Sequence, residues 1–472
     1  MLSSDKHVYK FPIPQKAGIK MPRNKDLTTD MTVGDPIKHI ILFALPALVG
    51  NVFQQVYNFA DSMIVGRYVS PDALAAVGAS SSIVFMLYAL CNGIGTGGGI
   101  LVSQYYGAHD EEKVKNCIVN TGLIMLIFPV LFGVAGFILA PQILELLSTP
   151  PEILSDSILY IRYMCSGLLF ISLYNYLAAM LRALGDSRSP LYFLILSTIL
   201  NVFLDILFVC YLHMGIRGAA KATIISQFVA MISCGIYARI INRYFRLSKT
   251  DFIITASMIG RIIRLGVPMS LQFALIAISS MAVQRIVNSY GTIVVAAFTA
   301  TSRIEMLIHQ PFTTLGAALA TYCGQNYGAK KLDRVYMGYR KGLLIMTVLT
   351  AAMILTMQLF GGAITSLFVT DQRIIDLGAL GLRITSLFYF PLGVIYVVRG
   401  VLTGVGDAFF ALFNGIVEVI GRFTIPLFMT KYMGMGETGI WVSAGVVWVL
   451  SAVTAYIRYL RHLHYRIKPS GS

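Results

Sequence analysis

Twelve apolar stretches, each about 20 residues or longer, constrain the fold of this chain more than any other feature of its sequence. About 20 consecutive apolar residues are needed for a helix to span the hydrocarbon core of a bilayer. The stretches lie at 37–64, 73–104, 113–140, 156–182, 189–212, 218–244, 259–287, 291–322, 336–361, 374–402, 408–431 and 437–460. Only 12% of the residues are charged, against about 25% in soluble domains. The sequence therefore predicts an all-α membrane protein with about twelve transmembrane helices.

An internal repeat divides these helices into two sets of six. The segment SQYYGAHDEEKV (103–114) returns as GQNYGAKKLDRV (324–335), and LRALGDSRSPLY (181–192) returns as LTGVGDAFFALF (402–413). Both pairs are separated by 221 positions. Because six spans precede the second copy, both halves start on the same side of the membrane. We therefore expect two pseudo-symmetric six-helix bundles, related as parallel repeats by an axis along the membrane normal.

The distribution of Lys and Arg predicts the orientation. Basic residues crowd the first 38 residues, the middle linker, the loop after the eighth helix and the C-terminus, which all fall on one side. By the positive-inside rule both termini are cytoplasmic, in a multi-pass protein of the cell membrane. We predict a disordered cytoplasmic tail at 1–35, an N-lobe at 36–245, a cytoplasmic linker at 246–257, a C-lobe at 258–462 and a C-terminal tail at 463–472. No cleavable signal peptide is evident, because the polar N-terminus lacks an apolar core.

Several function classes fit the composition poorly. The formal charge of +15 lies in loops rather than on a soluble basic face, so no nucleic-acid partner is expected. The six cysteines sit in apolar segments without metal-ligand spacing, so we expect no cofactor. An intramembrane enzyme would need a His/Ser or HExxH constellation, which the sequence lacks, so we expect no catalytic residues. The glycine run 93–99 lacks the Lys-Ser/Thr of a phosphate loop and predicts close helix packing.

Two acids interrupt the apolar stretches of the first half. Asp205 closes the run NVFLD, and Asn201 lies one turn before it on the same helix face. Asp61 closes a stripe of polar residues at helical spacing. The other members of this stripe are Asn51, Gln54 and Asn58. A carboxylate in hydrocarbon costs roughly 2.5–3.5 kcal/mol on insertion scales, so each acid is interpreted as part of a functional site facing the protein interior.

These acids allow two kinds of chemistry. With Asn201 and Thr223, which lies among small residues of the next helix, Asp61 and Asp205 offer oxygen ligands to Na⁺. Alternatively, two close carboxylates share a proton, since burial and mutual repulsion both oppose two negative charges. We predict a cation-coupling site at these four residues, with Gln54 and Asn58 as secondary polar contacts for substrate. A neutral, hydrogen-bonded structural carboxyl is the alternative.

The second half has no matching acids, and its polar residues differ in kind. Glu418 and Arg422 lie four apart on one face and are predicted to form an ion pair along their helix, as a secondary polar site. Glu305 shares a face with His309. We interpret Glu305 and His309 as residues for substrate or proton handling, with structural hydrogen bonding as the alternative.

These features together resemble the multidrug and toxic compound extrusion (MATE) family, of the bacterial and archaeal type with an acidic N-lobe site (DinF-like). The resemblance covers residues 33 to 460 and rests on the stretch LPALVGNVFQQVYNFADSMIVGR (45–67), the SQYYGA and GQNYGA motifs, the two Gly-Asp turns, and NVFLD (201–205). Members with an N-lobe cation site use acids on the first and fifth helices, an Asn one turn before the second acid, and a Thr on the sixth helix. These roles fall on Asp61, Asp205, Asn201 and Thr223.

The resemblance implies a two-lobed secondary transporter rather than an enzyme. Such a protein exchanges inward H⁺ or Na⁺ for outward movement of amphipathic, often cationic, compounds by alternating access. We expect a monomer that contacts small-molecule substrates and membrane lipids and needs no cofactor beyond its coupling ion. The main alternative is a lipid-linked oligosaccharide flippase, or an exporter of a specific metabolite, on the same fold. A flippase favours a strongly basic cavity, whereas the basic residues expected within spans are only Arg162, Arg303, Arg383 and Arg422.

Overall fold

The computed structural model describes residues 27–147 and 149–461, and within them it is helical throughout. The first half contains α1 (Pro36–Tyr68), α2 (Pro71–Gly107), α3 (Glu111–Leu146), α4 (Pro151–Ala183), α5 (Arg188–Asp205), the π-helix η1 (Ile206–Tyr211) and α6 (Ile216–Ile241). Two short 3₁₀ turns, η2 (Arg243–Phe245) and η3 (Lys249–Asp251), form the linker. The second half contains α7 (Ala256–Asn288), α8 (Thr292–Gly328), α9 (Leu332–Thr365), α10 (Gln372–Ser386), α11 (Tyr389–Gly404), α12 (Ala408–Leu427), the π-helix η4 (Phe428–Tyr432) and α13 (Thr438–Tyr459).

The number of membrane-spanning helices agrees with the sequence prediction. Within the described ranges, eleven helices are long and apolar enough to cross a membrane, and α10 with α11 makes a twelfth span. That last pair corrects one detail, since 374–402 was predicted as one continuous helix. The structure breaks it after Ser386 and bends it by 50°. The protein is therefore a multi-pass membrane protein.

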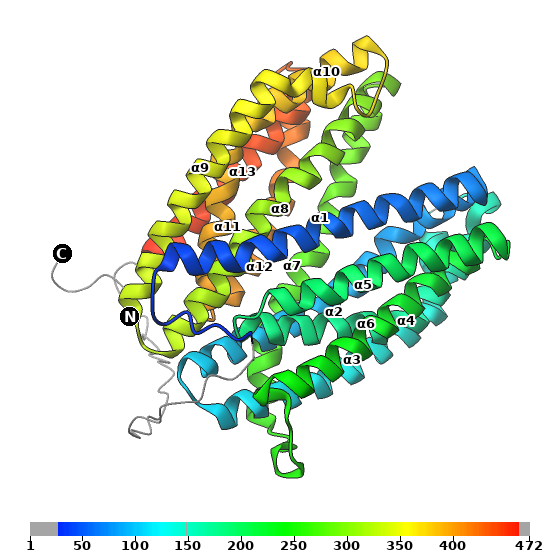
Figure 1. Ribbon diagram of the computed structural model, residues 1–472. Coiled ribbons are helices and arrows are strands. Elements are labelled where there is room, and N and C mark those ends of the chain that lie inside the picture. Colours follow the sequence, from blue (N-terminus) through cyan, green and yellow to red (C-terminus); the bar gives the residue numbers. More distant parts are fainter. Residues whose placement is uncertain (1–26, 148, 462–472) are drawn as a thin grey trace, which may run out of the picture.

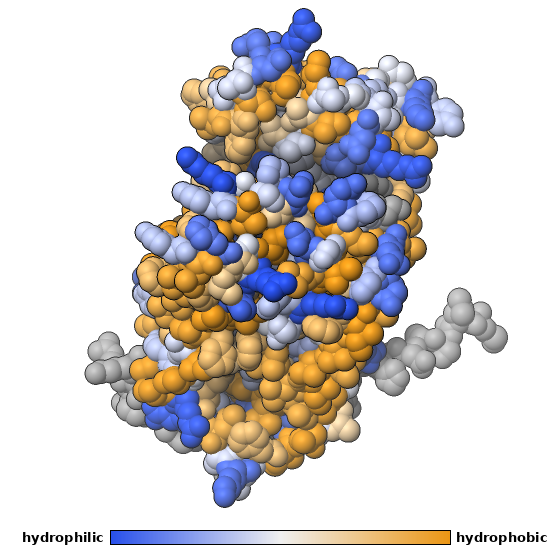
Figure 2. Space-filling model, turned by 90° about the vertical axis from the view of Figure 1, so that its right-hand side faces the viewer, coloured by the Kyte–Doolittle hydropathy of each residue, from blue (hydrophilic) through white to orange (hydrophobic). Residues whose placement is uncertain are grey.

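Two helical bundles make up the molecule and diverge from one end (Figure 1). Helices α2 to α6 pack on one another in the first bundle, and α7 to α13 pack in the second. Helix α1 contacts α5 of the first bundle and α8 of the second. Figure 2 views the molecule from the right-hand side of Figure 1, and apolar side chains cover much of both bundles there. Such an apolar surface suits contact with lipid.

The backbone repeats its unusual conformations at the spacing of the sequence repeat. Positive φ angles occur at Gly185 (86°) and Gly406 (94°), and again at His109 (56°) and Lys330 (59°). Each pair is 221 residues apart. The π-helices η1 and η4 likewise follow α5 and α12. The two halves therefore share local geometry as well as helix order, as the sequence repeat predicts.

Close packing between the bundles is concentrated near the end where α1 begins. The glycine run of α2 meets the first half of α7 there: a Cβ on Gly97 would lie 2.6 Å from the Gly266 nitrogen, and one on Gly93 would lie 2.3 Å from the Ser270 nitrogen. The predicted role of this run in helix packing is confirmed. Since α1 begins at this end, we call it the tail side, and the bundles separate toward the opposite, open side (Figure 1).

The predicted disordered tail needs a correction over its last nine residues. Residues 1–26 lie outside the described part of the chain, as do 462–472. Residues 27–35 instead form hydrogen bonds with both bundles: the Thr29 amide donates to Leu184 in the first, and the Met31 amide donates to the Gln325 side chain in the second. Asp35 then caps α1 by accepting from the amides of Ile37 and Lys38. Backbone groups that were expected to face water therefore have protein partners.

Candidate functional site

The acids of the first half lie on two neighbouring helices. Asp61 is in the last third of α1, and Asp205 is the final residue of α5, where the α-helix changes to the π-helix η1. Short π segments are frequent at functional sites, because they shift side chains out of the regular helical register. The two carboxyl groups are close enough to interact electrostatically. Asp205 is fully buried, and Asn201, one turn earlier, is 1% exposed.

Hydrogen bonds connect the other predicted members of this site. The Asn201 amide nitrogen donates to the Thr223 hydroxyl over 3.4 Å, and the Thr223 hydroxyl donates to the Ala219 carbonyl over 3.2 Å. The structure thus brings residues of α1, α5 and α6 together. We call Asp61, Asn201, Asp205 and Thr223 the acidic site.

Four buried oxygen atoms of the acidic site have no donor among the described residues. They are Oδ1 of Asp61, Oδ1 of Asn201 and both carboxylate oxygens of Asp205. Buried polar atoms are almost always hydrogen-bonded, and an unpaired one costs about 1–3 kcal/mol, more if it is charged. An acceptor-only cluster of this kind can be satisfied by a proton or by a cation with oxygen ligands. The acidic site is therefore equipped to bind a positive charge.

Two tyrosines at this site were not predicted from the sequence. The Tyr57 hydroxyl lies 3.2 Å from that of Thr223, and Tyr57 and Tyr160 both interact electrostatically with Asp61 and Asp205. Tyr57 is one turn before Asp61 on α1, so helical spacing alone pointed to it. Tyr160 comes from α4, and nothing in the sequence links that helix to the acids.

The predicted secondary contacts on α1 have different environments. Gln54 lines a polar cavity of about 10 Å³ together with Tyr57, Asn201 and Gln227, which is room for about one water molecule. Asn58 is exposed, and its side chain has no hydrogen bond with a described residue. Gln54 thus belongs to the surroundings of the acidic site, whereas Asn58 does not.

In the second bundle, the predicted ion pair has a different cation. Glu418 pairs with Arg399 of α11 over 2.8 Å, whereas Arg422 has no ion pair in the described ranges. Arg399 also donates to Asn414 Oδ1 over 2.6 Å, and a Gln272 amide turned toward it accepts from Nε and Nη1. Glu418 therefore pairs with an arginine of the adjacent helix α11 rather than with Arg422 on its own helix, because α11 places Arg399 directly against it. Arg399 must also be added to the basic residues predicted within spans.

Glu305 and His309 lie near this network, and each carries one buried atom that is not hydrogen-bonded within the described part of the chain. Glu305 Oε1 and His309 Nε2 are buried and have no hydrogen bond with a described residue. Glu305 interacts electrostatically with Arg422, and the His309 ring lies 5.8 Å from the ring of Trp448. We call Glu305, His309, Arg399, Glu418 and Arg422 the second polar cluster.

The repeated motifs meet each other across the two bundles on the tail side. The Gln104 side chain of the first motif donates to the Gly404 carbonyl over 2.8 Å, and Gln325 of the second donates to the Ala183 carbonyl over 3.2 Å. Each acceptor precedes the Gly-Asp turn of the other bundle, and both donors and both acceptors are 221 residues apart. We call this pair of bonds the glutamine contact.

Glycine is required at the centre of this contact. A Cβ on Gly107 would lie 1.8 Å from the Gln325 carbonyl oxygen, and a Cβ on Gly328 would lie 1.8 Å from that of Gln104. The two α-helices α2 and α8 therefore approach each other through backbone at their C-terminal ends. Any side chain at either position would force the bundles apart.

Residues 27–35 reinforce the same side, and we call them the latch. Arg334 of α9 donates to the carbonyls of Met31 and Gly34, and Asn326 of α8 also donates to Met31. On the first bundle, Gly185 adopts a φ of +86° and has no room for a Cβ, which would lie 2.3 Å from the Thr29 oxygen. The latch thus joins both bundles where they are already in contact.

A membrane protein with two pseudo-symmetric bundles, closed against each other on one side and carrying buried acids within a bundle, has the architecture of a secondary transporter. The family model described as MatE matches the chain twice, over residues 46–207 and 268–427. The chain therefore belongs to the MATE family, the multidrug and toxic compound extrusion transporters. The two matches correspond to the two halves of the internal repeat.

Known proteins support this assignment over nearly the whole chain. The chain is 29% identical over 433 residues to the probable multidrug resistance protein YoeA of Bacillus subtilis (strain 168), covering 89% of this chain and 92% of that protein. A MATE crystal structure in complex with MaL6 superposes with a TM-score of 0.87 at 23% identity, covering 92% and 98%. An outward-facing multidrug resistance MATE transporter of the MOP superfamily superposes with a TM-score of 0.85 at 25% identity, covering 94% and 100%.

Proposed function

We propose that this protein is a secondary multidrug exporter that exchanges inward H⁺ or Na⁺ for outward movement of amphipathic, often cationic, compounds. The observation that carries the proposal is the set of four buried, donor-free oxygens at the acidic site. A site of this kind changes its charge when a cation arrives, which is what coupling to a cation gradient requires. The protein acts in the cell membrane as a monomer with both termini in the cytoplasm, and it needs no cofactor besides its coupling ion.

Cation binding drives the exchange only if the acidic site binds more tightly in one conformation than in the other. Asp61 is carried by α1, which also contacts α8 of the second bundle, whereas Asp205 is fixed in the first bundle. A bend or rotation of α1 would therefore change the separation of the two carboxyl groups and hence their affinity for a positive charge. This links ion binding to the position of the two bundles.

The second polar cluster contains a carboxylate, Glu305, that is suited to bind a cationic substrate. Glu305 Oε1 is buried without a donor, and the aromatic rings of Tyr396 and Trp448 lie within 6.3 Å of the His309 ring. His309 lies one helical turn after Glu305, and aromatic rings in the neighbourhood of a carboxylate favour binding of an organic cation. We assign Glu305 to recognition of a cationic substrate and the Arg399–Glu418 pair to holding the helices around it.

Alternating access follows from closing one side of the molecule and opening the other. With the termini in the cytoplasm, the glutamine contact and the latch close the cytoplasmic side, and the open side faces outward. Opening the cytoplasmic side must break the bonds of Gln104, Gln325 and the latch. The relatives that are named as multidrug resistance proteins do not favour a lipid-linked oligosaccharide flippase.

The test is dye efflux from proteoliposomes that contain the purified protein, with an imposed H⁺ gradient or an imposed Na⁺ gradient. The parent protein is compared with Asp205→Asn and with Asp376→Asn, which changes an exposed acid on α10. We expect one of the gradients to drive efflux of a cationic dye such as ethidium, Asp205→Asn to abolish it, and Asp376→Asn to keep it.

The outcomes separate the parts of the proposal. The gradient that drives efflux identifies the coupling ion. Efflux by Asp205→Asn at the parent rate would refute coupling at the acidic site. Absence of gradient-driven efflux in the parent, with the protein folded and inserted, would refute the exporter itself.

A further inference from the structure

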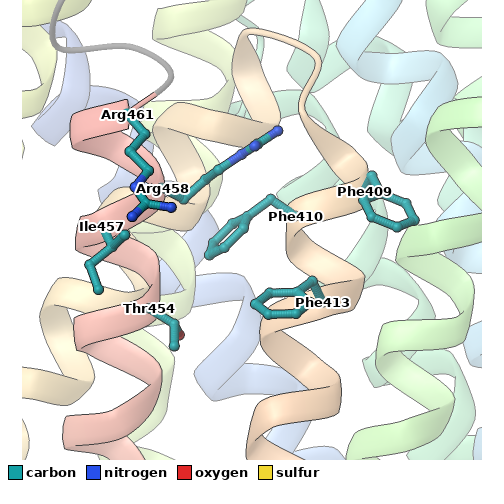
Figure 3. A pocket seen from close by; sticks show the side chains of 7 residues that line it. All are labelled: Phe409, Phe410, Phe413, Thr454, Ile457, Arg458 and Arg461. Atoms are coloured by element: carbon teal, nitrogen blue, oxygen red, sulfur yellow. The ribbon is translucent and has the colours of Figure 1, made fainter. Parts of the chain in front are cut away.

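A pocket of about 410 Å³ lies between α12 and α13 on the tail side, away from both polar sites. Phe409, Phe410 and Phe413 of α12 line it together with Ile457 of α13. Figure 3 shows Phe410 and Phe413 projecting toward α13, with Arg458 and Arg461 toward the end of that helix. The volume is in the range of small-molecule sites.

The apolar part of the pocket is open to the outside of the bundle. Phe409 is 69% exposed, Phe413 is 47% exposed and Ile457 is 42% exposed. These residues belong to helices long and apolar enough to cross a membrane. Lipid acyl chains therefore have direct access to Phe413 and Ile457, and Phe410, which is only 4% exposed, lies at the base of the pocket.

The two arginines give the pocket a positive rim. Arg458 donates through Nε to Asp407 Oδ2 over 2.9 Å, so its terminal nitrogens remain available. Arg461 has no ion pair within the described ranges, which leaves one net positive charge at the rim. Guanidinium groups bind phosphate oxygens through paired N–H donors. Arg458 lies in the last turn of α13, and Arg461 lies two residues after the helix ends at Tyr459. Since the span ends here, both arginines are at the level of lipid headgroups.

We propose that this pocket binds an anionic glycerophospholipid, with its phosphate between Arg458 and Arg461 and an acyl chain against Phe410 and Phe413. The net charge of the rim favours a headgroup with one net negative charge over a zwitterionic one, whose own cation would face the arginines. The pocket is also close to the glutamine contact, because Asp407 follows the Gly404 acceptor by three residues. A bound lipid thus lies next to the turn that helps to close the tail side, since Arg458 pairs with Asp407 of that turn.

Native mass spectrometry of the full-length protein in detergent tests this site directly. The protein is titrated with phosphatidylglycerol or with phosphatidylcholine of the same acyl chains, and the bound fraction is measured. We expect at least fivefold tighter binding of phosphatidylglycerol. Arg461→Gln should abolish this preference, and Arg461→Lys should retain it because the charge remains.

Two further variants separate the acyl contact from general effects on the surface. Phe413→Ser should weaken binding of both lipids, whereas Phe423→Ser changes a phenylalanine of α12 that is 49% exposed outside the pocket and should leave binding unchanged. Arg239→Gln on α6, which is exposed in the other bundle, should keep the preference for phosphatidylglycerol.

Three results would overturn the proposal. The first is equal binding of the two lipids by the parent. The second is an unchanged preference in Arg461→Gln. The third is a loss of preference in Arg239→Gln as large as that in Arg461→Gln. The readout is binding rather than transport, so it does not depend on the coupling ion.

Discussion

Replacing Gly107 by alanine should open the tail side of the molecule. The new Cβ would lie 1.8 Å from the Gln325 carbonyl oxygen, and the bundles must move apart by roughly 1.2 Å to reach 3.0 Å, the shortest separation that Cβ atoms tolerate. The obstacle is backbone, so no side chain can rotate away. The displacement stretches the bonds from Gln104 to Gly404 and from Gln325 to Ala183.

The size of the effect follows from those two bonds. Each contributes about 1 kcal/mol net, so losing both destabilises the tail-closed state by about 2 kcal/mol. Such a change shifts the ratio of tail-closed to tail-open molecules by about 30-fold. A shift at least as large should appear in Gln104→Ala combined with Gln325→Ala, which removes both bonds, and also the bond from the Met31 amide to Gln325, without introducing a clash.

Distances between spin labels measure the shift. Labels at Arg239→Cys and Arg340→Cys, one exposed tail-side position in each bundle, should show a longer distance population in Gly107→Ala. Gly78→Ala is the matched control, because it lies on the same helix with no atom within 4 Å of its new Cβ. An unchanged distance distribution in Gly107→Ala, in protein that stays monodisperse, would refute the role of the glutamine contact in closing the tail side.

Three further outcomes are expected. Arg399→Leu leaves Glu418 buried without its partner, so it should lower the free energy of unfolding by about 3–5 kcal/mol and lower the Tm. Adding Glu418→Leu should recover much of this loss, and no recovery in the double variant would contradict the role of the pair. Burial raises the pKa of the Asp186 carboxyl at the α4–α5 turn, although hydrogen bonds from Ser189 oppose this. The folded protein therefore favours the protonated form, its stability should fall as the pH rises above about 4, and Asp186→Asn should show a flatter dependence of Tm on pH. Tyr57→Phe removes a hydroxyl 3.2 Å from that of Thr223 and should weaken ion coupling about fivefold, or about 1 kcal/mol, measured as the ion concentration for half-maximal efflux.

Helical spacing within single helices predicted which polar side chains of the acidic site lie together, and their role in cation coupling stays a prediction. Asn201 and Asp205 share a face of α5 because they are four residues apart, and the expected convergence with Asp61 and Thr223 is present in the structure. Tyr160 could not be predicted, because its place beside the acids depends on how α4 packs in the first bundle. The pairing of Arg399 with Glu418 was missed for the same reason. The four-residue spacing of Glu418 and Arg422 predicted the wrong ion pair, since an arginine on an adjacent helix can lie closer to Glu418 than one on the same helix.

The sequence by itself determined the membrane-spanning architecture, its division into two repeated halves and the acids of the first half. These follow from hydrophobicity, from a constant offset and from the high cost of charges in lipid, all of which are properties of the chain alone. Only the tertiary structure decided that the repeated glutamine and glycine motifs meet across the bundles, that residues 27–35 bridge them, and which cation pairs with Glu418. Those contacts join residues as much as 303 positions apart, and their formation depends on the packing of whole helices, which no local pattern encodes.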